Sequence, residues 1–388
     1  MTRPLLNRRL DGLGNSIFGV MSARAVATNS VNLGQGFPDV DGPPGIAKAA
    51  ADAVIAGKGN QYPPATGVPE LRNAVARHQQ RFYGLEYDPD TEVLITAGAT
   101  EAIAAALLAL LEPGDEVIAF EPYYDSYVAN IAMAGGTRVP LTLRAPDFRP
   151  DLAELERKIT GKTRLLLLNS PHNPTGMVLT RTETEAIAQL AIRHDLLVIT
   201  DEAYEHLTFD REHIPLATID GMRGRVVSIG SAGKTFSFTG WKVGWATAAP
   251  DLINAVRTTK QFLTFVSSGP FQYAVAEALD LPDSYYADMA ADLKAKRDLM
   301  AAGLAEIGFG VYQPDGTYFI TTDIAPLGEQ DAMEFCKGLP DRAGVVAIPS
   351  AVFYDDHPEE GRTLVRFAFC KRPEVLKEAL SRLSVLGR

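Results

Sequence analysis

The sequence predicts an α/β protein with a large three-layer αβα domain, built on a mostly parallel sheet, and a smaller α+β domain. Three observations support this prediction. The 388 residues, 46% hydrophobic and 22% charged, suffice for a large core. From about residue 93, short apolar runs alternate with helical segments, and beyond residue 280 the alternation stops. We expect an N-terminal arm and part of the small domain over residues 1–44, the large domain over 45–280 and the C-terminal small domain over 281–388.

In chain order, the first forty residues are expected to form an extended arm and a crossing loop, because Pro38, Pro43 and Pro44 follow Gly34-Gln-Gly36. The small domain begins with a long charged helix and ends with another helix, and short strands lie between them. Helical composition also separates the apolar runs of the large domain, which suits a parallel sheet covered on both faces. The predicted strands are Val93–Ala97, Val117–Phe120, Leu165–Leu168, Leu197–Thr200, Val226–Ile229, Tyr318–Thr322 and Val365–Phe369, and the predicted helices include Glu101–Leu111, Thr182–His194, Ser284–Ile307 and Pro373–Leu386.

Composition excludes several classes of partner. The formal net charge is -11 without a long acidic or basic run, so neither a nucleic-acid surface nor an anionic-membrane surface is expected. The most apolar run, Ala102–Leu111, is too short to span a bilayer, and the N-terminus has no stretch of signal-peptide length. Cys336 and Cys370 form no Cys-x-x-Cys motif, and no metal ligands are predicted. We therefore expect a small-molecule partner and a reducing, cytoplasmic location.

Chemically suggestive residues follow each predicted strand of the large domain. In an open α/β sheet, ligands bind outside the carboxyl ends of the strands. Five such ends are therefore expected to converge on one site. The residues concerned are Gly98 to Thr100, Tyr123 and Tyr124, Asn173, Asp201, and Ser231 to Lys234.

Lys234 and Asp201 are the candidate catalytic residues. Lys234 lies among small residues, with the cationic Lys242 nearby, and both burial and a like charge lower the pKa of an amine so that it can attack an aldehyde. The segment is equally compatible with a Gly/Ser-rich turn that carries surface lysines. Asp201 ends an apolar strand, where a carboxylate can keep a ring nitrogen protonated. Alternatively, Asp201 caps a helix.

Polar groups that could hold a ligand accompany this pair. The proline-rich segment Asn169–Gly176 presents the Asn173 amide at a defined angle, and both Asn173 and Tyr204 could donate to a phenolate oxygen. The loop Thr96–Glu101 leads into a helix that is expected to begin near Thr100, where free N–H groups suit a phosphate, although a plain helix cap is the alternative. Ser231 and Lys242 would add a hydroxyl and a charge to the same phosphate.

Arg366 lies within the apolar strand Leu364–Phe369. A buried guanidinium requires an anionic partner, which is either an internal acid or the carboxylate of a ligand.

The chain resembles the fold-type I, pyridoxal-phosphate-dependent aminotransferases of class I/II over essentially its whole length. It is most similar to the branch of kynurenine, glutamine and methionine aminotransferases and actinobacterial N-succinyldiaminopimelate aminotransferases. The motifs that carry the resemblance are Asn32-Leu-Gly-Gln-Gly-Phe-Pro-Asp39, Asn60-Gln-Tyr62, Glu121-Pro-Tyr-Tyr-Asp125, Ser170-Pro-His-Asn-Pro-Thr-Gly176, Thr200-Asp-Glu-Ala-Tyr204, Ser231 to Trp245 and Val365-Arg-Phe367. His172, where many members have asparagine, and the pair Ala99-Thr100, which replaces a Gly-Tyr pair of some members, depart from the pattern.

The resemblance implies a role for each candidate residue. Lys234 would form the imine with the pyridoxal phosphate of the 45–280 domain and act as the base, while Asp201 would pair with the pyridinium nitrogen. Asn173 and Tyr204 would hold the ring oxygen. Tyr62 would reach the phosphate in the neighbouring subunit of a homodimer. The other implied contacts are Tyr124 to the ring face, Ala99, Thr100, Ser231 and Lys242 to the phosphate, and Gly36 and Arg366 to the substrate carboxylate.

The implied reaction moves an amino group from an amino acid to a 2-oxo acid. The donor is expected to be N-succinyl-LL-diaminopimelate or an amino acid of the kynurenine, glutamine or methionine type. Phe18, Tyr62 and Tyr124 would form an aromatic pocket for the second group, whereas Arg24 and Lys260 are candidates for the extra carboxylates of the first. Two alternatives are a carbon–sulfur β-lyase of cysteine conjugates and the cofactor-binding domain of a transcription regulator, for whose DNA-binding domain the short arm leaves no room.

Overall fold

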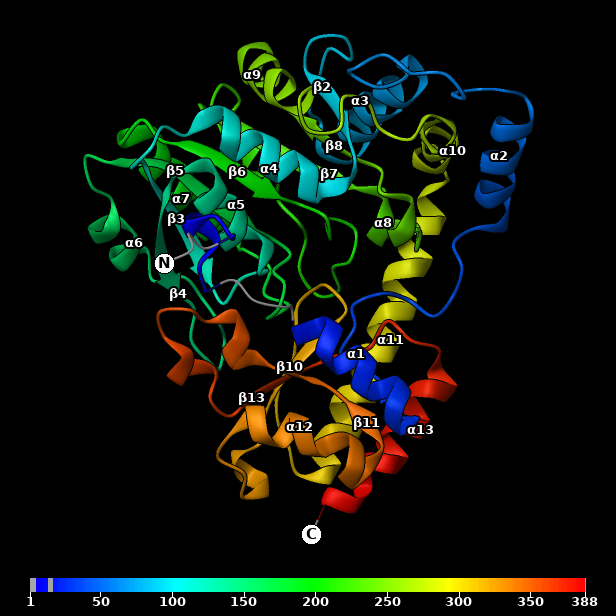
Figure 1. Cartoon of the computed structure of the whole chain (residues 1–388), viewed down its shortest axis with the longest axis vertical. Helices are drawn as coiled ribbons and strands as arrows, with labels where there is room; N and C mark the ends of the chain where they lie inside the picture. Colours follow the sequence, from blue (N-terminus) through cyan, green and yellow to red (C-terminus); the bar gives the residue numbers. More distant parts are fainter. Residues whose placement is uncertain (1–4, 13–16, 388) are drawn as a thin grey trace.

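A seven-stranded sheet forms the centre of the upper part of the molecule in the computed structural model, which describes residues 5–12 and 17–387 (Figure 1). Its strand order is β2-β8-β7-β6-β5-β3-β4. The strand β8 runs antiparallel to both of its neighbours, and all other pairs are parallel, which confirms the predicted mostly parallel sheet. The strands are β2 (Val93–Thr96), β3 (Glu116–Glu121), β4 (Thr137–Thr142), β5 (Thr163–Asn169), β6 (Leu197–Asp201), β7 (Val226–Ser231) and β8 (Gly244–Thr247).

Successive residues of these strands enter different cores because side chains alternate across a sheet. In β3, Val117 and Ala119 contribute to the core on one side, and Ile118 and Phe120 to the core on the other. The first side is covered by α4 (Gly98–Leu110), α5 (Ser126–Ala134) and α9 (Pro250–Lys260). The second contains residues of α2 (Pro44–Ile55), α3 (Pro69–Tyr83), α7 (Arg181–Arg193) and α10 (Gly269–Leu279). Both faces of the sheet are therefore buried.

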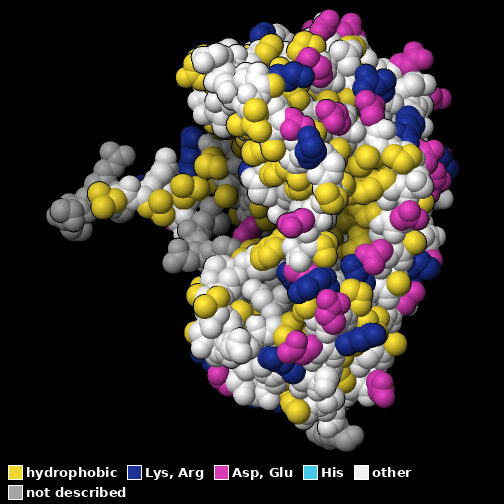
Figure 2. Space-filling view, turned by 90° about the vertical axis from the view of Figure 1, so that its right-hand side faces the viewer, with side chains coloured by type: hydrophobic (Ala, Val, Ile, Leu, Met, Phe, Trp, Pro, Cys, Tyr) yellow, Lys and Arg dark blue, Asp and Glu magenta, His cyan; other side chains and the backbone are white. Residues whose placement is uncertain are grey.

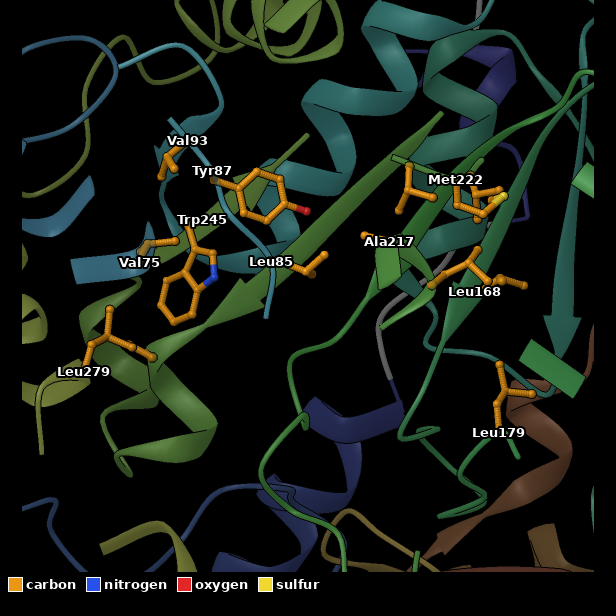
Figure 3. Close-up of a cluster of buried hydrophobic side chains, with 14 of the residues drawn as sticks. Val75, Leu85, Tyr87, Val93, Leu168, Leu179, Ala217, Met222, Trp245 and Leu279 are labelled. Carbon is orange, nitrogen blue, oxygen red and sulfur yellow. The ribbon is translucent and has the colours of Figure 1, made fainter. Parts of the chain in front are cut away.

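Figure 3 shows part of the second core, where Trp245 of β8 and Val93 of β2 lie near Val75 of α3 and Leu279 of α10. Aromatic and branched side chains from the strands thus fill the space beneath helices that are distant in the sequence. The short helices α6 (Leu152–Lys158) and α8 (Ala232–Thr235) complete this part of the chain.

A second, antiparallel sheet lies in the lower part of the molecule (Figure 1). Its order is β12-β13-β10-β9, and a separate parallel pair joins β1 (Val31–Asn32) to β11 (Val345–Val346). The residues after β1 therefore lie beside the C-terminal part of the chain. The other elements are α1 (Ile17–Thr28), α11 (Asp283–Ile307), α12 (Ala332–Ala343), α13 (Pro373–Leu383), β9 (Gly310–Tyr312), β10 (Phe319–Asp323), β12 (Ile348–Pro349) and β13 (Leu364–Ala368). The domain boundaries at residues 44/45 and 280/281 remain a prediction.

Two expectations about the secondary structure are wrong. The N-terminal segment is not extended throughout, because residues 17–28 form helix α1, which buries Met21 and Ala25 one turn apart. The helix expected to begin near Thr100 begins two residues earlier, at Gly98, with Ala97 as its N-cap. None of the described helices is both long enough and apolar enough to cross a membrane.

Candidate active site

A cavity of about 310 Å³ lies at the carboxyl ends of the parallel strands, where the two sheets approach each other. The ends of β5, β6 and β7 and the start of α4 supply one wall, and Gly36 and Arg366 supply the other. The cavity brings together most of the predicted site residues, namely Phe18, Gly36, Ala99, Thr100, Tyr124, Asn173, Asp201, Tyr204, Ser231, Lys234, Lys242 and Arg366, whereas Tyr62, Tyr123, Arg24 and Lys260 do not line it. Convergence of the strand ends, expected from the sequence, thus produces the site.

Lys234 lies on the short helix α8, directly after β7. The Ser231 hydroxyl caps this helix by accepting from the Gly233 N–H at 3.4 Å. Burial lowers the pKa of Lys234, and the charges of Lys242 and Arg366 add to this effect, whereas Asp201 opposes it. The lysine therefore has the half-buried position that favours a free amine.

Asp201 is buried at the end of β6 and keeps two hydrogen bonds. Its Oδ1 accepts from the Ala203 N–H at 3.1 Å, and its Oδ2 accepts from the Tyr127 hydroxyl at 2.6 Å. Burial raises the pKa of Asp201, while the bonds from Tyr127 and Ala203 and the charge of Lys234 lower it. The two bonds thus favour the ionised carboxylate inside a buried site.

Asn173 is fixed by a chain of amides. The Asn169 side chain donates to the Asp201 carbonyl at 2.8 Å and accepts from the Asn173 N–H at 2.7 Å. The Asn173 Oδ1 then accepts from Nη1 of Arg366 at 2.9 Å. Since its oxygen is occupied by arginine, the amide N–H₂ of Asn173 is the group left to donate to a ligand.

Arg366 is 1% exposed and lies on β13. Its Nη2 donates to the Gly34 carbonyl at 3.0 Å, and its guanidinium carbon lies 4.0 Å from the ring centroid of Phe319 and 5.2 Å from that of Phe18. Burial lowers the pKa of the guanidinium to about 10, and Nε has no hydrogen-bond partner among the described residues. A buried cation that donates to a neutral amide oxygen and a neutral carbonyl oxygen suits an anionic ligand better than an internal ion pair.

The opposite end of the cavity offers a cradle for a second anion. Gly98 opens the 13-residue helix α4 with φ +75°, and a Cβ at this position would lie 3.2 Å from Nζ of Lys242. The hydroxyls of Thr100 and Ser231 line the same cavity. A cation, hydroxyl groups and a helix N-terminus form a set of donors that fits a phosphate.

Three residues that the sequence analysis proposed for ligand contacts, Tyr62, Arg24 and Lys260, lie outside the cavity. Tyr62 is 81% exposed and packs edge-on against Phe265 at 5.4 Å between ring centroids. Arg24 pairs with Asp341, and the buried Lys260 donates to the Phe265 carbonyl at 3.1 Å. This subunit therefore does not bring Arg24 or Lys260 to the cavity.

Sequence reasoning missed several residues that complete the site. Tyr127, in the first turn of α5, follows Tyr124 by three residues, a spacing that could have indicated that both side chains lie on the same side of the chain. Asn169 is the first residue of a motif in which only Asn173 was singled out. Tyr318 and Phe319 had no local signal, because they reach the site only through the pairing of β10 with β13.

Comparison with known proteins agrees with this geometry. Residues 28–383 match the family described as aminotransferase class I and II. The chain is 52% identical to the probable N-succinyldiaminopimelate aminotransferase DapC of Mycobacterium tuberculosis, over 98% of both chains. It is 40% identical to a methionine aminotransferase of Escherichia coli, over 97% of both. A solved N-succinyldiaminopimelate aminotransferase from M. tuberculosis superposes with a TM-score of 0.95 at 52% identity, covering 98% of this chain and 100% of that one.

The chain belongs to the class I and II aminotransferases. It is a pyridoxal-phosphate-dependent enzyme that acts on amino acids and 2-oxo acids, which confirms the resemblance, the fold class and the cofactor expected from the sequence. The residues present fit this cofactor, since the cavity has a lysine, a carboxylate at a strand end and a phosphate cradle.

Proposed function

We propose that this aminotransferase moves the amino group of N-succinyl-LL-diaminopimelate to 2-oxoglutarate. The observation that carries the proposal is the cavity in which Lys234, Asp201 and Arg366 meet. The donor is proposed because the DapC relative, 52% identical over nearly the whole chain, bears that name. Amino acids of the methionine, kynurenine or glutamine type are the competing donors.

Each residue has a defined task in this proposal. Bound pyridoxal phosphate supplies an electron sink next to the carbon that loses its proton. Nζ of Lys234 takes this proton and returns it one position away, which a lowered amine pKa favours. The Asp201 carboxylate would pair with the ring nitrogen and keep it protonated. The Asn173 amide and the Tyr204 hydroxyl bind the ring oxygen, and the Arg366 guanidinium orients the substrate carboxylate.

The phosphate cradle is assigned to Lys242, Ser231, Thr100 and the N–H groups of Ala99 and its neighbours at the start of α4. Tyr124 is assigned to the face of the ring, and its hydroxyl is hydrogen-bonded to that of Thr100. Phe18 and Gly36 are assigned to the substrate. All these residues line the same cavity.

The donor carries carboxylates beyond the one at the reacting carbon. The described residues that line the cavity include three cations, Lys234, Lys242 and Arg366, and each already has a task. We therefore assign the remaining carboxylates to the rim of the cavity, where a second subunit can contribute.

The functional unit in this proposal is a homodimer in which Tyr62 reaches the phosphate of the neighbouring subunit. Support comes from apolar side chains that are exposed in the single chain: Tyr62, Phe262, Leu263 and Phe265. The rings of Tyr62 and Phe265 contact each other, and exposed apolar patches on a protein surface often mark sites of protein–protein contact. Figure 2 shows one face of the molecule, on which hydrophobic side chains gather near the middle. A cytoplasmic location is proposed from the two free, buried cysteines.

The test is a comparison of donors at fixed 2-oxoglutarate, with glutamate formation as the readout. N-succinyl-LL-diaminopimelate is expected to give a kcat/KM at least about tenfold above those of methionine, kynurenine and glutamine. An equal or higher value for one of these amino acids would contradict the proposed donor but not the aminotransferase activity. No observation in the site favours the β-lyase, and pyruvate released from a cysteine conjugate without a 2-oxo acid would indicate it.

A further inference from the structure

Three side chains of the types that bind metal ions meet outside the catalytic cavity. His78 lies on helix α3, and Glu205 and His206 lie in the turn that follows β6. One ligand atom of each residue lies within 4.8 Å of the ligand atoms of the other two. None of the three lines the cavity, and none has a task in the proposed reaction. Because 128 positions of sequence separate His78 from His206, no local motif indicated a metal site.

This cluster lies among aromatic rings. His78 is 2% and Glu205 6% exposed, while His206 is partly buried. The ring centroid of His206 lies 4.6 Å from that of Phe82 and 4.4 Å from that of Tyr286. Placing two imidazoles and a carboxyl group in such surroundings costs stability unless their polar atoms have partners.

The cluster has more hydrogen-bond acceptors than donors. The Nε2 atoms of His78 and His206 lie 2.7 Å apart, so only one of these nitrogens can carry a proton. Oε2 of Glu205 and Oε1 of Gln79, the neighbour of His78, have no hydrogen-bond partner among the residues that the structure describes. Buried acceptors without partners are rare in folded proteins, and a cation would satisfy several of them at once.

The ionisation of these groups also suits a cation. Burial lowers the pKa of His78 to about 3 and lowers the pKa of His206 as well. The two rings are therefore neutral, as a metal-binding imidazole must be. Burial and the charge of Glu202 raise the pKa of Glu205 to about 8. A divalent cation beside this carboxyl group would supply the positive charge that its ionised form lacks.

The ligand types point to zinc. Two imidazole nitrogens and a carboxylate oxygen are a typical zinc set, whereas Mg²⁺ and Ca²⁺ prefer oxygen alone. Tetrahedral bonds of about 2.0–2.1 Å place two ligand atoms roughly 3.3 Å apart. The rings of His78 and His206 must therefore separate slightly from their present 2.7 Å. Since His206 is partly exposed, an ion and a water ligand can enter from that side.

Gln79 can support a metal-bound His78. Its Nε2 lies 3.4 Å from Nδ1 of His78. A half-turn of this amide exchanges Nε2 for Oε1, the atom that has no partner. Oε1 would then accept the Nδ1–H of a His78 whose Nε2 binds the metal, which is the usual support of a metal-binding histidine.

We propose that His78, Glu205 and His206 bind one Zn²⁺ ion, with water as the fourth ligand, and that this ion joins helix α3 to the turn after β6. Asp201 ends β6, and Tyr204 directly precedes Glu205, so the ion stabilises a segment that carries two residues of the cavity. Its role is structural because its ligands lie outside the cavity. The proposal does not rest on the identity of the amino donor.

The test uses the holoenzyme, freed of metal with a chelator and then incubated with ZnCl₂ or MgCl₂. The readouts are the zinc bound per chain, the zinc dissociation constant measured against a competing chelator, the Tm, and X-ray absorption at the zinc edge. We expect one zinc ion per chain with a dissociation constant below about 1 μM. At a zinc concentration about a hundredfold above that constant, the Tm should rise by about 3–6 °C. X-ray absorption should show nitrogen and oxygen ligands at about 2.0–2.2 Å, two of them imidazoles.

His78→Gln and His206→Gln each remove one ligand, and His194→Gln, at an exposed position that caps the end of α7, is the matched control. Either cluster variant should bind zinc at least about a hundredfold more weakly and lose the zinc-dependent rise in Tm, so one suffices if the other does not fold. His194→Gln should behave as wild type. Glu205→Gln is unsuited to this comparison because it also changes the stability of the metal-free protein.

Three results would overturn the proposal. They are a wild-type enzyme that does not bind zinc at this affinity, wild-type zinc affinity in His78→Gln or His206→Gln, and an equal rise in Tm with MgCl₂. Amino transfer by the metal-free and the zinc-loaded holoenzyme is measured in parallel. Its absence from both forms would contradict the proposed function and leave the zinc site untouched.

Discussion

The hydroxyl of Tyr127 donates a hydrogen bond of 2.6 Å to Oδ2 of Asp201. Both side chains are buried, and the bond joins the first turn of α5 to the end of β6. Tyr124, three residues earlier, lines the same cavity, with its ring 5.8 Å from that of Tyr127. The segment that leads into α5 thus carries both the side chain proposed for the face of the cofactor ring, Tyr124, and the hydroxyl that binds Asp201.

Tyr127→Phe is expected to raise the pKa of Asp201, because burial then acts with one fewer hydrogen bond to oppose it. Since the carboxylate is the form that keeps the ring nitrogen protonated, kcat should fall about three- to thirtyfold, and cofactor affinity should fall with it. Tyr286→Phe is the control, because the buried Tyr286 donates to the Leu279 carbonyl outside the cavity. Equal kcat and cofactor affinity in Tyr127→Phe and wild type would contradict this expectation.

Lys234→Ala should lower amino transfer by at least about a thousandfold, because it removes the amine proposed to move the substrate proton. Borohydride should no longer fix the cofactor to the protein, which peptide mass spectrometry would detect at Lys234 in the wild type. Lys377→Ala, on the exposed side of α13, should behave as wild type. Normal turnover in Lys234→Ala would refute the assignment.

Arg366→Lys should raise the KM for the amino donor about ten- to a hundredfold while leaving the cofactor's absorption spectrum in place. The lysine keeps the charge but loses the planar fork that binds a carboxylate and also bonds Gly34 and Asn173. Steady-state kinetics with varied donor would measure this. A change confined to kcat would show that the arginine acts on the reacting centre instead.

Mixing two inactive variants tests whether Tyr62 acts across a subunit boundary. If Lys234→Ala and Tyr62→Ala are each inactive, dimers re-formed from an equal mixture should recover about one quarter of wild-type turnover, because about half are hybrids and each hybrid has one intact site. Refolding each variant alone is the control. No recovery in the mixture would place Tyr62 in the same site as Lys234 of its own chain.

Glu205→Gln should make the enzyme's stability less dependent on pH. Burial and the charge of Glu202 raise the pKa of Glu205 from 4.5 to about 8. Between these values the folded protein keeps a proton that the unfolded chain releases, so the free energy of unfolding falls as pH rises from 4.5 to 8. Glutamine stays neutral throughout this pH range and has nearly the same size as glutamate.

Thermal unfolding at several pH values would measure this difference. The Tm of Glu205→Gln should exceed that of wild type by roughly 2–6 °C at pH 8.5 and match it at pH 5. Glu306→Gln, at an exposed position, is the control. Parallel Tm curves for Glu205→Gln and wild type would contradict the raised pKa.

Sequence reasoning could predict the parts of the site whose residues directly follow a recognisable strand in the sequence. The apolar run that ends in Asp201 matches β6 (Leu197–Asp201), because a buried parallel strand needs continuous apolar residues and its polar end marks the ligand side. Lys234, Asn173 and Thr100 follow other strand ends in the same way. Their positions in one cavity agree with the prediction, whereas their roles await the experiments above.

The missed features depend on distant parts of the chain. The strand β4 (Thr137–Thr142) contains Pro140 and lies at the sheet edge, where proline is tolerated, so its composition did not indicate a strand. The strand β8 contains Gly244 and pairs antiparallel between β2 and β7. Tyr318 reaches Gly36 across 282 positions of sequence. Such contacts are set by tertiary packing and have no local signature.

The pairing of β1 with β11 has a consequence for the protein during its synthesis. Val31 cannot find its partner Val345 until nearly the whole chain has left the ribosome, and Arg366 emerges later still. A nascent chain that already contains Lys234 and Asp201 therefore still lacks Arg366, the residue proposed to bind the substrate carboxylate. On the proposed roles, the residues assigned to the cofactor aldehyde are thus synthesised before the arginine assigned to the substrate carboxylate, and the substrate site can be completed only after the C-terminal part of the chain has folded.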